Sequence, residues 1–146
     1  MQVKIKKLNE NAVVPTKAHE SDFAYDLTAT SVEEVAPGVY KYGTGIAIQI
    51  DEDVDPNVTV GFGIRPRSSI YKTGLVLANS VGTIDLNYTG ELMLVFYKVV
   101  ENGTLYKVGD RIGQLYFDYT LPIDFEEVTD LTSTDRGNGG FGSTGK

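Results

Sequence analysis

Apolar residues recur at every second position in three separate stretches of the chain, a spacing that predicts β-strands with one buried face. The predicted inner faces are Thr44, Ile46, Ile48 and Ile50, then Val58, Val60, Phe62 and Ile64, and finally Leu92, Leu94 and Phe96. No stretch keeps the longer period of an amphipathic helix over several turns. Short strands therefore dominate the predicted structure.

Turn-forming residues separate the predicted strands. They lie at Ala36-Pro37-Gly38, Asp53-Val54-Asp55-Pro56-Asn57 and Glu101-Asn102-Gly103. Many short strands joined by tight turns are typical of an all-β protein. We expect a jelly-roll-like β-sandwich or barrel.

Two segments depart from the β pattern. Pro66 to Gly74 predicts one short helical turn, with a serine as N-cap, Gly74 as terminator and an N-terminus suited to an anion. Residues 133–146 contain five glycines and almost no apolar residue, so alone they form a flexible arm. We expect one β domain over residues 1–132, with residues 133–146 as a glycine-rich extension of it.

Composition narrows the function. The 146 residues fit a single domain, and the absence of cysteine excludes disulfides, thiolate nucleophiles and cysteine-ligated zinc. A net charge of −7 argues against nucleic acid or an anionic membrane as partner. With no signal-peptide pattern at the N-terminus and no apolar run that could span a bilayer, we expect the cytoplasm.

Four segments carry residue types that a packed β core does not need. Asp26 interrupts an apolar strand, Pro66 to Ser69 places an arginine at a helix start, Asn79 to Gly90 reads as a hairpin with an acid and an aromatic ring, and Asp135 to Gly145 is glycine-rich with an arginine. Each also has an ordinary structural explanation: a solvent-facing edge residue, a capped helix, a β-turn and a disordered tail.

Together with Gly109-Asp110-Arg111-Ile112-Gly113-Gln114, these segments resemble the five motifs of the trimeric dUTPase family in order and approximate spacing. The most specific are Gly-x-Ile-Asp-x-x-Tyr-x-Gly from Gly82 and Arg-Gly-x-Gly-Gly-Phe-Gly-Ser-Thr-Gly from Arg136. The resemblance extends from about Lys4 to the end. It implies a homotrimer with three shared sites, a C-terminal arm that closes as a lid, and hydrolysis of dUTP to dUMP and pyrophosphate.

The resemblance also implies the chemistry of each residue. Asp85 corresponds to the general base that activates a water for attack on the α-phosphorus, and a carboxylate partly shielded from water suits that task. Mg²⁺ is implied as cofactor, held mainly by the phosphates, with Asp26 reaching it through water. The residues implied to hold phosphates are Arg67, Ser68, Ser69 and Gln114, joined from the lid by Arg136, Ser143 and Thr144.

Recognition of the nucleoside is implied for the hairpin. Asn79 and backbone groups of Thr83, Ile84 and Met93 would read the edge of uracil, and cytosine would leave buried polar groups unpaired. Tyr88 corresponds to the ring that excludes a ribose 2′-hydroxyl, and Phe141 to a ring that stacks on uracil.

Alternatives remain open on the residues alone. A dCTP deaminase shares the fold but uses a glutamate where this chain has Val95, ten residues after Asp85. A non-catalytic jelly-roll binding protein is a second alternative, and a dUTPase with an additional protein partner a third. Ser69 and Thr89 depart from common family residues, and we expect Arg65 and His19 to be surface residues without a role in the site.

Overall fold

The structure is a computed structural model that describes residues 2–50, 58–79 and 81–140. Its elements follow in the order β1 (Val3–Lys7), β2 (Tyr25–Thr28), β3 (Ser31–Ala36), β4 (Val39–Gly43), β5 (Ile46–Ile50), β6 (Thr59–Arg65), η1 (Ser68–Lys72), β7 (Leu75–Leu77), β8 (Gly82–Ile84), β9 (Met93–Lys98) and β10 (Arg111–Thr120). Within the described residues no helix is long and apolar enough to cross a bilayer.

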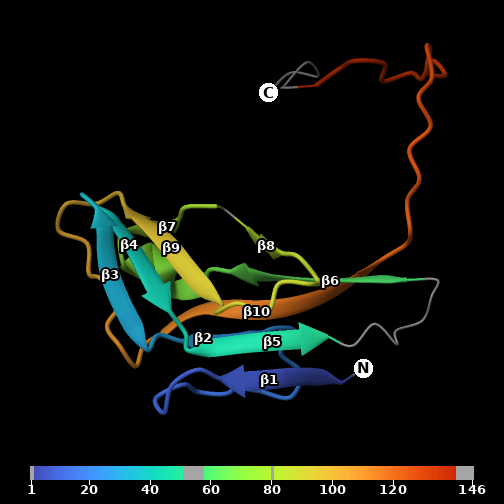
Figure 1. The fold of residues 1–146 in the computed structure, drawn as a ribbon. Helices are drawn as coiled ribbons and strands as arrows, with labels where there is room; N and C mark the ends of the chain where they lie inside the picture. The colour runs from blue at the N-terminus through green and yellow to red at the C-terminus, as the bar shows by residue number, and fades with distance from the viewer. Residues whose placement is uncertain (1, 51–57, 80, 141–146) are drawn as a thin grey trace.

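The strands form three antiparallel sheets (Figure 1). Their orders are β1-β5, then β2-β10-β6-β8, then β3-β4-β9-β7. The arrangement is an open sandwich and not a closed barrel, so the all-β prediction is confirmed and its first alternative is the correct one.

One apolar core lies between the sheets. The predicted inner faces are confirmed except at Val58, which precedes β6 and is only half-buried. The buried members are Thr44, Ile46, Ile48, Ile50, Val60, Phe62, Ile64, Leu92, Leu94 and Phe96. The two four-stranded sheets approach closely where β10 carries Gly113, since a Cβ there would collide with the Leu94 side chain of β9. This contact fixes the end of β10 that carries the candidate phosphate-binding residues.

The helical turn is confirmed, but its type and its N-cap are not as predicted. The residues form a 3₁₀-helix, η1, whose N-cap is Arg67, with no side-chain capping bond. A serine cap was the wrong prediction because the chain enters the turn one residue earlier, with Arg67 in the extended region (ψ 153°) and its carbonyl accepting from Ile70 N–H (3.0 Å). Gly74 follows the turn at φ 74°, as expected of a terminating glycine.

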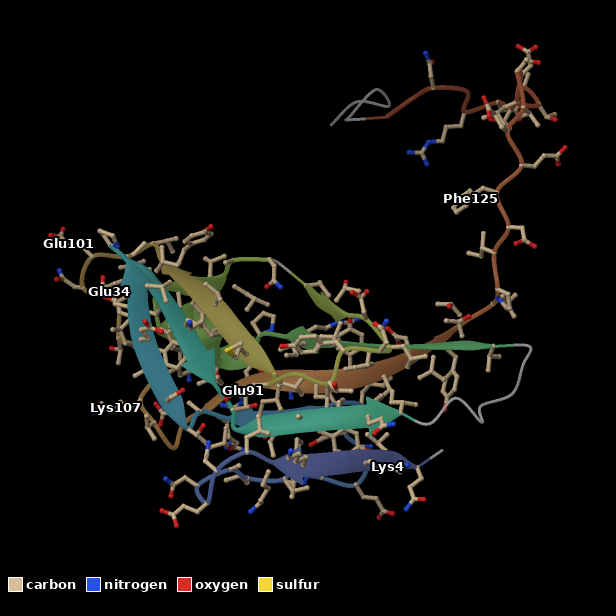
Figure 2. The ribbon with its side chains drawn as sticks, in the orientation of Figure 1. Lys4, Glu34, Glu91, Glu101, Lys107 and Phe125 are labelled. Atoms are coloured by element: carbon tan, nitrogen blue, oxygen red, sulfur yellow. The ribbon has the colours of Figure 1, made fainter. Side chains whose placement is uncertain are left out.

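After β10 the chain leaves the sheets altogether (Figure 1). Residues 121–138 are exposed, and the departure begins at Leu121, twelve residues before the glycine-rich segment that starts at residue 133. The exposed stretch carries large apolar side chains, among them Ile123 (71% exposed), Phe125 (97%) and Leu131 (88%). Figure 2 shows Phe125 standing clear of the sheets.

Candidate active site

Three neighbouring strands place polar side chains in one row at the end of the sheet β2-β10-β6-β8. Gln114 of β10 lies opposite Asp26 of β2 on one side and opposite Arg65 of β6 on the other. Directly opposed residues of antiparallel strands project to the same face. Arg67 follows two residues after Arg65, and Arg111 opens β10, so both lie beside this row.

Asp26 joins two of the arginines. Its carboxylate accepts from Arg67 Nε–H at Oδ1 (3.3 Å) and from Arg111 Nη1–H at Oδ2 (2.8 Å). The Asp26 side chain is only 10% exposed, so the carboxylate depends on these charge-assisted bonds in place of water. The pair of bonds holds both guanidinium groups in fixed positions and leaves further N–H groups of each for a ligand.

The row opens into a groove of about 340 Å³, lined by Asp26, Arg65, Arg67, Arg111 and Gln114 together with Phe23 and Tyr116. Of the two acids that line it, Asp26 is already paired, and Asp22 accepts from the backbone N–H of His19 (2.9 Å). Three guanidinium groups in one groove give it local positive charge within a chain of net charge −7. Such a groove suits a polyanion of several phosphates.

The turn η1 lies next to the groove and supplies backbone donors. Its first hydrogen bond runs from Ile70 N–H to the Arg67 carbonyl, so the N–H groups of Ser68 and Ser69 precede the bonded part of the turn. A 3₁₀ turn of five residues carries little macrodipole. The attraction for anions at this place therefore comes chiefly from the guanidinium groups.

The hairpin after β8 is the second polar cluster. Its turn is closed by Tyr88 N–H donating to the Asp85 carbonyl (2.9 Å). The Tyr88 hydroxyl donates to the Glu91 carbonyl (2.9 Å), and its ring covers Gly90 so closely that a Cβ on Gly90 would lie 2.5 Å from the hydroxyl oxygen. The sequence thus requires glycine at position 90 for the tyrosine ring to lie where it does.

Glu91 anchors this hairpin to the neighbouring sheet. Its carboxylate accepts from Gly45 N–H (2.7 Å), and the adjacent Leu92 carbonyl accepts from the buried Thr44 hydroxyl (2.7 Å). Figure 2 shows Glu91 where β4 and β5 meet. These bonds fix the hairpin without using the side chains of Asp85 and Asn79, which remain exposed.

The predicted nucleoside-binding residues are mostly accessible in the single chain. Thr83 is exposed, Tyr88 is 41% exposed and Ile84 is half-buried. Met93 (43% exposed) lies apart from β8 in strand order, at the start of β9, where it pairs with Gly43. Asp85, expected to be partly shielded from water, is exposed in the single chain.

One chain does not bring the two clusters together. Ile84 lies opposite Phe62 on one side of β6, whereas Gln114 lies opposite Arg65 on the other side. Three residues along a strand and two strand spacings across the sheet separate their Cα atoms by about 14 Å. The groove is lined by none of the hairpin residues.

The arm adds little within the described part of the chain. The Arg136 side chain bonds only locally, with Nε–H donating to the Gly139 carbonyl (3.1 Å). Phe141, Ser143 and Thr144 lie outside the described residues. The structure thus unites Asp26, Arg67 and Gln114, keeps Ser68 and Ser69 beside them, and leaves the hairpin and arm residues apart.

Sequence reasoning missed Arg65 as a groove residue, along with the aromatic pair Phe23 and Tyr116. Arg65 is half exposed, as expected, but it faces the groove. The one feature of the sequence that pointed to Arg65 was its position two residues before Arg67, at the end of a predicted strand. The decisive fact, its register opposite Gln114, depends on strand pairing and cannot be read from one strand.

No group of three or more histidine, aspartate or glutamate side chains that could hold a metal ion occurs in residues 2–50, 58–79 and 81–140. The two carboxylates that line the groove, Asp22 and Asp26, already accept hydrogen bonds, so an ion held mainly by ligand phosphates and water fits these residues.

A family model described as dUTPase matches residues 10–145 of the chain. A deoxyuridine 5'-triphosphate nucleotidohydrolase from Corynebacterium glutamicum is 40% identical over 147 residues, which cover 99% of this chain and 95% of that protein. A protein of the same name from Paramecium bursaria Chlorella virus 1 is 42% identical over 146 residues, with 97% and 96% covered.

Solved structures agree in fold. The dUTPase of Staphylococcus bacteriophage 80alpha with dUPNHPP superposes with a TM-score of 0.80 at 24% identity and covers 99% of both chains. A mutant dUTPase from phage phi11 of S. aureus, described with a structural Mg(II) ion, gives a TM-score of 0.71 at 20% identity and covers 91% of this chain and 100% of that one. The likeness confirms the predicted jelly-roll-like fold.

Proposed function

The chain belongs to the dUTPase family, and from that premise we propose how it acts as a dUTP diphosphatase, hydrolysing dUTP to dUMP and pyrophosphate. The observation that carries the proposal is the groove in which Asp26 holds Arg67 and Arg111 beside Gln114. It gives an acidic chain one place with the charge and the donors for a triphosphate.

Arg67, Gln114 and the N–H and hydroxyl groups of Ser68 and Ser69 bind phosphate oxygens in this proposal. Asp26 acts mainly by positioning, because both of its oxygens already accept from guanidinium groups. Arg136, Ser143 and Thr144 add donors when the arm closes over the bound nucleotide. The glycines beside them let the backbone approach the phosphates closely.

Mg²⁺ is the proposed cofactor, supported by membership of the dUTPase family and by the structural Mg(II) ion described for the phage phi11 neighbour. When bound, the ion supplies positive charge that neutralises the triphosphate oxygens. Asp26 would reach it through a water, since its two oxygens lie against Arg67 and Arg111.

Asp85 is the proposed general base. Its carboxylate takes a proton from a water, whose oxygen forms a bond to the α-phosphorus while the bond from that phosphorus to the bridging oxygen breaks. The products are dUMP and pyrophosphate. The hydrogen bonds of Glu91 to Gly45 and Tyr88 support this proposal, because they hold the hairpin without involving the Asp85 carboxylate.

The nucleoside is read at the same hairpin. Asn79 and backbone groups of Thr83, Ile84 and Met93 bind the uracil edge, Tyr88 lies against the deoxyribose, and Phe141 stacks on the base from the arm. The separation of about 14 Å between hairpin and groove in one chain supports sites completed by more than one copy. A homotrimer with shared sites and a C-terminal lid is therefore part of the proposal.

The exposed apolar residues of the arm support self-association, since large apolar side chains on an extended segment are stabilised by burial against another surface. A cytoplasmic location, the absence of nucleic-acid or membrane partners, and an additional protein partner stay predictions.

The test is a panel of substrates. Purified protein with Mg²⁺ is incubated separately with dUTP, dCTP, dATP, dGTP, dTTP and UTP, and pyrophosphate and ammonia are measured. Pyrophosphate from dUTP far in excess of the others is the expected result. Ammonia from dCTP would favour the deaminase alternative, and no turnover of any nucleotide would favour a binding protein.

A further inference from the structure

We propose that Arg65 is a further phosphate-binding residue of this groove, one that strengthens binding of the pyrophosphate portion of the substrate. The inference deepens the proposed function and rests on it. Arg65 lies outside the five family motifs. Its place in the sheet, the aromatic rings beneath it and its weak ion pair all favour this role.

The position follows from strand register. Arg65, Gln114 and Asp26 lie directly opposite one another on β6, β10 and β2, so their side chains share a face and a row. Arg67 and Arg111 are tied to Asp26 in the same row. Arg65 therefore extends the cluster of guanidinium groups across the groove and lines it with them.

Two stacked aromatic rings, those of Tyr116 and Phe23, form an aromatic shelf beneath the Arg65 side chain. The Arg65 guanidinium lies over the Tyr116 ring at 3.9 Å from its centroid, and the Tyr116 ring stacks against Phe23 with centroids 6.5 Å apart. Gly63 makes room for the shelf, because a Cβ there would lie 2.8 Å from the Tyr116 hydroxyl oxygen. A guanidinium held over a ring face engages the ring through its π-face, so its N–H groups remain available to the oxygens of a phosphate.

The Arg65 guanidinium has a weak ion pair and is therefore available to bind an anion. Its ion-pair partner among the described residues is Asp118, at 3.9 Å from Nη2, and both side chains are about half exposed (50% and 49%). An exposed ion pair at that separation contributes little to stability, because water screens both charges. Asp26 pairs with Arg67 and Arg111, and the described residues show no ion pair between Asp26 and Arg65.

A purely structural role for Arg65 would need only the stack on Tyr116. That role predicts an effect on stability and none on anion affinity. A phosphate-binding role predicts a loss of affinity for polyanions when Arg65 is removed, because a polyanion gains a charge-assisted pair with Arg65. The nucleoside end of the substrate gains no such pair. Affinities for pyrophosphate and dUMP therefore separate the two roles.

The experiment measures binding of pyrophosphate with Mg²⁺, and of dUMP, by titration calorimetry on the full-length protein. Arg65→Gln is expected to weaken pyrophosphate binding about 10-fold and to leave dUMP binding unchanged. Lys41→Gln is the matched control, since Lys41 is a partly exposed cation paired with Glu33 (3.1 Å) away from the groove. It is expected to change neither affinity.

Asp118→Asn gives a gain-of-function test. Removing the competing carboxylate is expected to tighten pyrophosphate binding two- to threefold or so, and the gain should vanish in the double variant Arg65→Gln/Asp118→Asn. Urea unfolding of each variant verifies that the fold is kept.

The inference is overturned if Arg65→Gln, folded, binds pyrophosphate within twofold of wild type, if the Asp118→Asn gain persists in the double variant, or if the wild type binds no pyrophosphate. These outcomes are distinct from failure of the proposed function, which is decided by turnover of dUTP by the wild type. A wild type that turns over dUTP while Arg65→Gln keeps its pyrophosphate affinity would discard Arg65 alone.

Discussion

Three tyrosine hydroxyl groups differ in their hydrogen bonding, and the difference predicts which of them matter for stability and which for substrate selection. Tyr42 donates to the Tyr106 carbonyl (3.0 Å) inside the core, and Tyr88 donates to the Glu91 carbonyl (2.9 Å) at the hairpin. The Tyr106 hydroxyl is buried without a hydrogen-bond partner among the described residues. A buried hydroxyl without a partner is costly, so these three groups respond differently to loss of the oxygen.

Tyr88→Ala is expected to weaken discrimination between dUTP and UTP, because loss of the ring opens room for the ribose 2′-hydroxyl. Tyr88→Phe is the matched control. It keeps the ring over Gly90 and loses only the bond to the Glu91 carbonyl, so most of the discrimination should remain. Relative kcat/KM for the two nucleotides is the measurement, and an unchanged ratio in Tyr88→Ala would place sugar selection elsewhere.

Tyr106→Phe and Tyr42→Phe form a second pair, with stability as the readout. Tyr42→Phe removes a satisfied bond and is expected to cost about 1 kcal/mol, whereas Tyr106→Phe removes an unpaired oxygen and should be neutral or stabilising by up to about 1 kcal/mol. Urea unfolding at neutral pH measures both. Equal losses in the two variants would show that the Tyr106 hydroxyl has a partner in solution.

The same tyrosines set a pH dependence. Burial is the main cause that raises the pKa of Tyr42 and of Tyr106 above the ordinary 10.0. Below pH 10 both states keep these protons, and as pH rises further the unfolded chain releases them first. Folded stability should therefore fall as pH rises above 10, and the double Phe variant should lose less stability over that range than wild type.

Among the elements, β10 connects the groove to the C-terminal arm. Its first residues pair with β2 and contribute Arg111 and Gln114 to the groove, and its last residues pair with β6 before the arm departs. The arm then has two chemically different parts. Residues 121–131 are extended and carry exposed apolar side chains, while residues 133–146 are rich in glycine.

Deleting residues 134–146 is expected to leave a folded trimer with little activity, because that segment carries Arg136 and Phe141 but almost nothing apolar to bury. The matched variant Ile123→Asp/Phe125→Asp alters the apolar part and should instead weaken the trimer. Sedimentation and dUTP turnover together check both. A truncated chain with wild-type turnover, or one that falls to monomers, would contradict this division of the arm.

Over the whole molecule, the main feature is the distance between hairpin and groove. The sheet holds both rigidly, since β6 pairs with β8 on one side and with β10 on the other. Bending one cluster toward the other would break these ladders. A complete site is therefore expected to combine the hairpin of one copy with the groove of another.

Two inactive variants should restore one another if this holds. Asp85→Asn is expected to bind dUTP but hydrolyse almost none, because only the base is lost, and Arg67→Gln should lose phosphate binding. Random mixing within trimers places both wild-type groups at about one quarter of the sites, so about that fraction of activity should return after co-refolding. No recovery from verified mixed trimers would mean that each chain forms its site alone.

The sequence by itself determined three of the strand stretches and two of the predicted turns, at Ala36-Pro37-Gly38 and Glu101-Asn102-Gly103, while the third predicted turn, at residues 53–57, lies outside the described residues. Alternation of apolar residues such as Ile46 and Ile48 reports which face of a strand is buried, because the period of two is a local property of extended backbone. Glycine at position 74 likewise marks the end of η1, since its φ of 74° disfavours other residues.

Only the tertiary structure decided which of these residues meet. Asp26, Arg67 and Arg111 are up to 85 positions apart in the chain, and their ion pairs depend on β2 and β10 lying in register, which no single strand encodes. The pairing of β6 with β10 brought Arg65 into the groove, and the hairpin after β8, on the other side of β6, does not line it. Register is set by packing of the whole sandwich, so a pattern read along one strand predicts its buried face but not its neighbours.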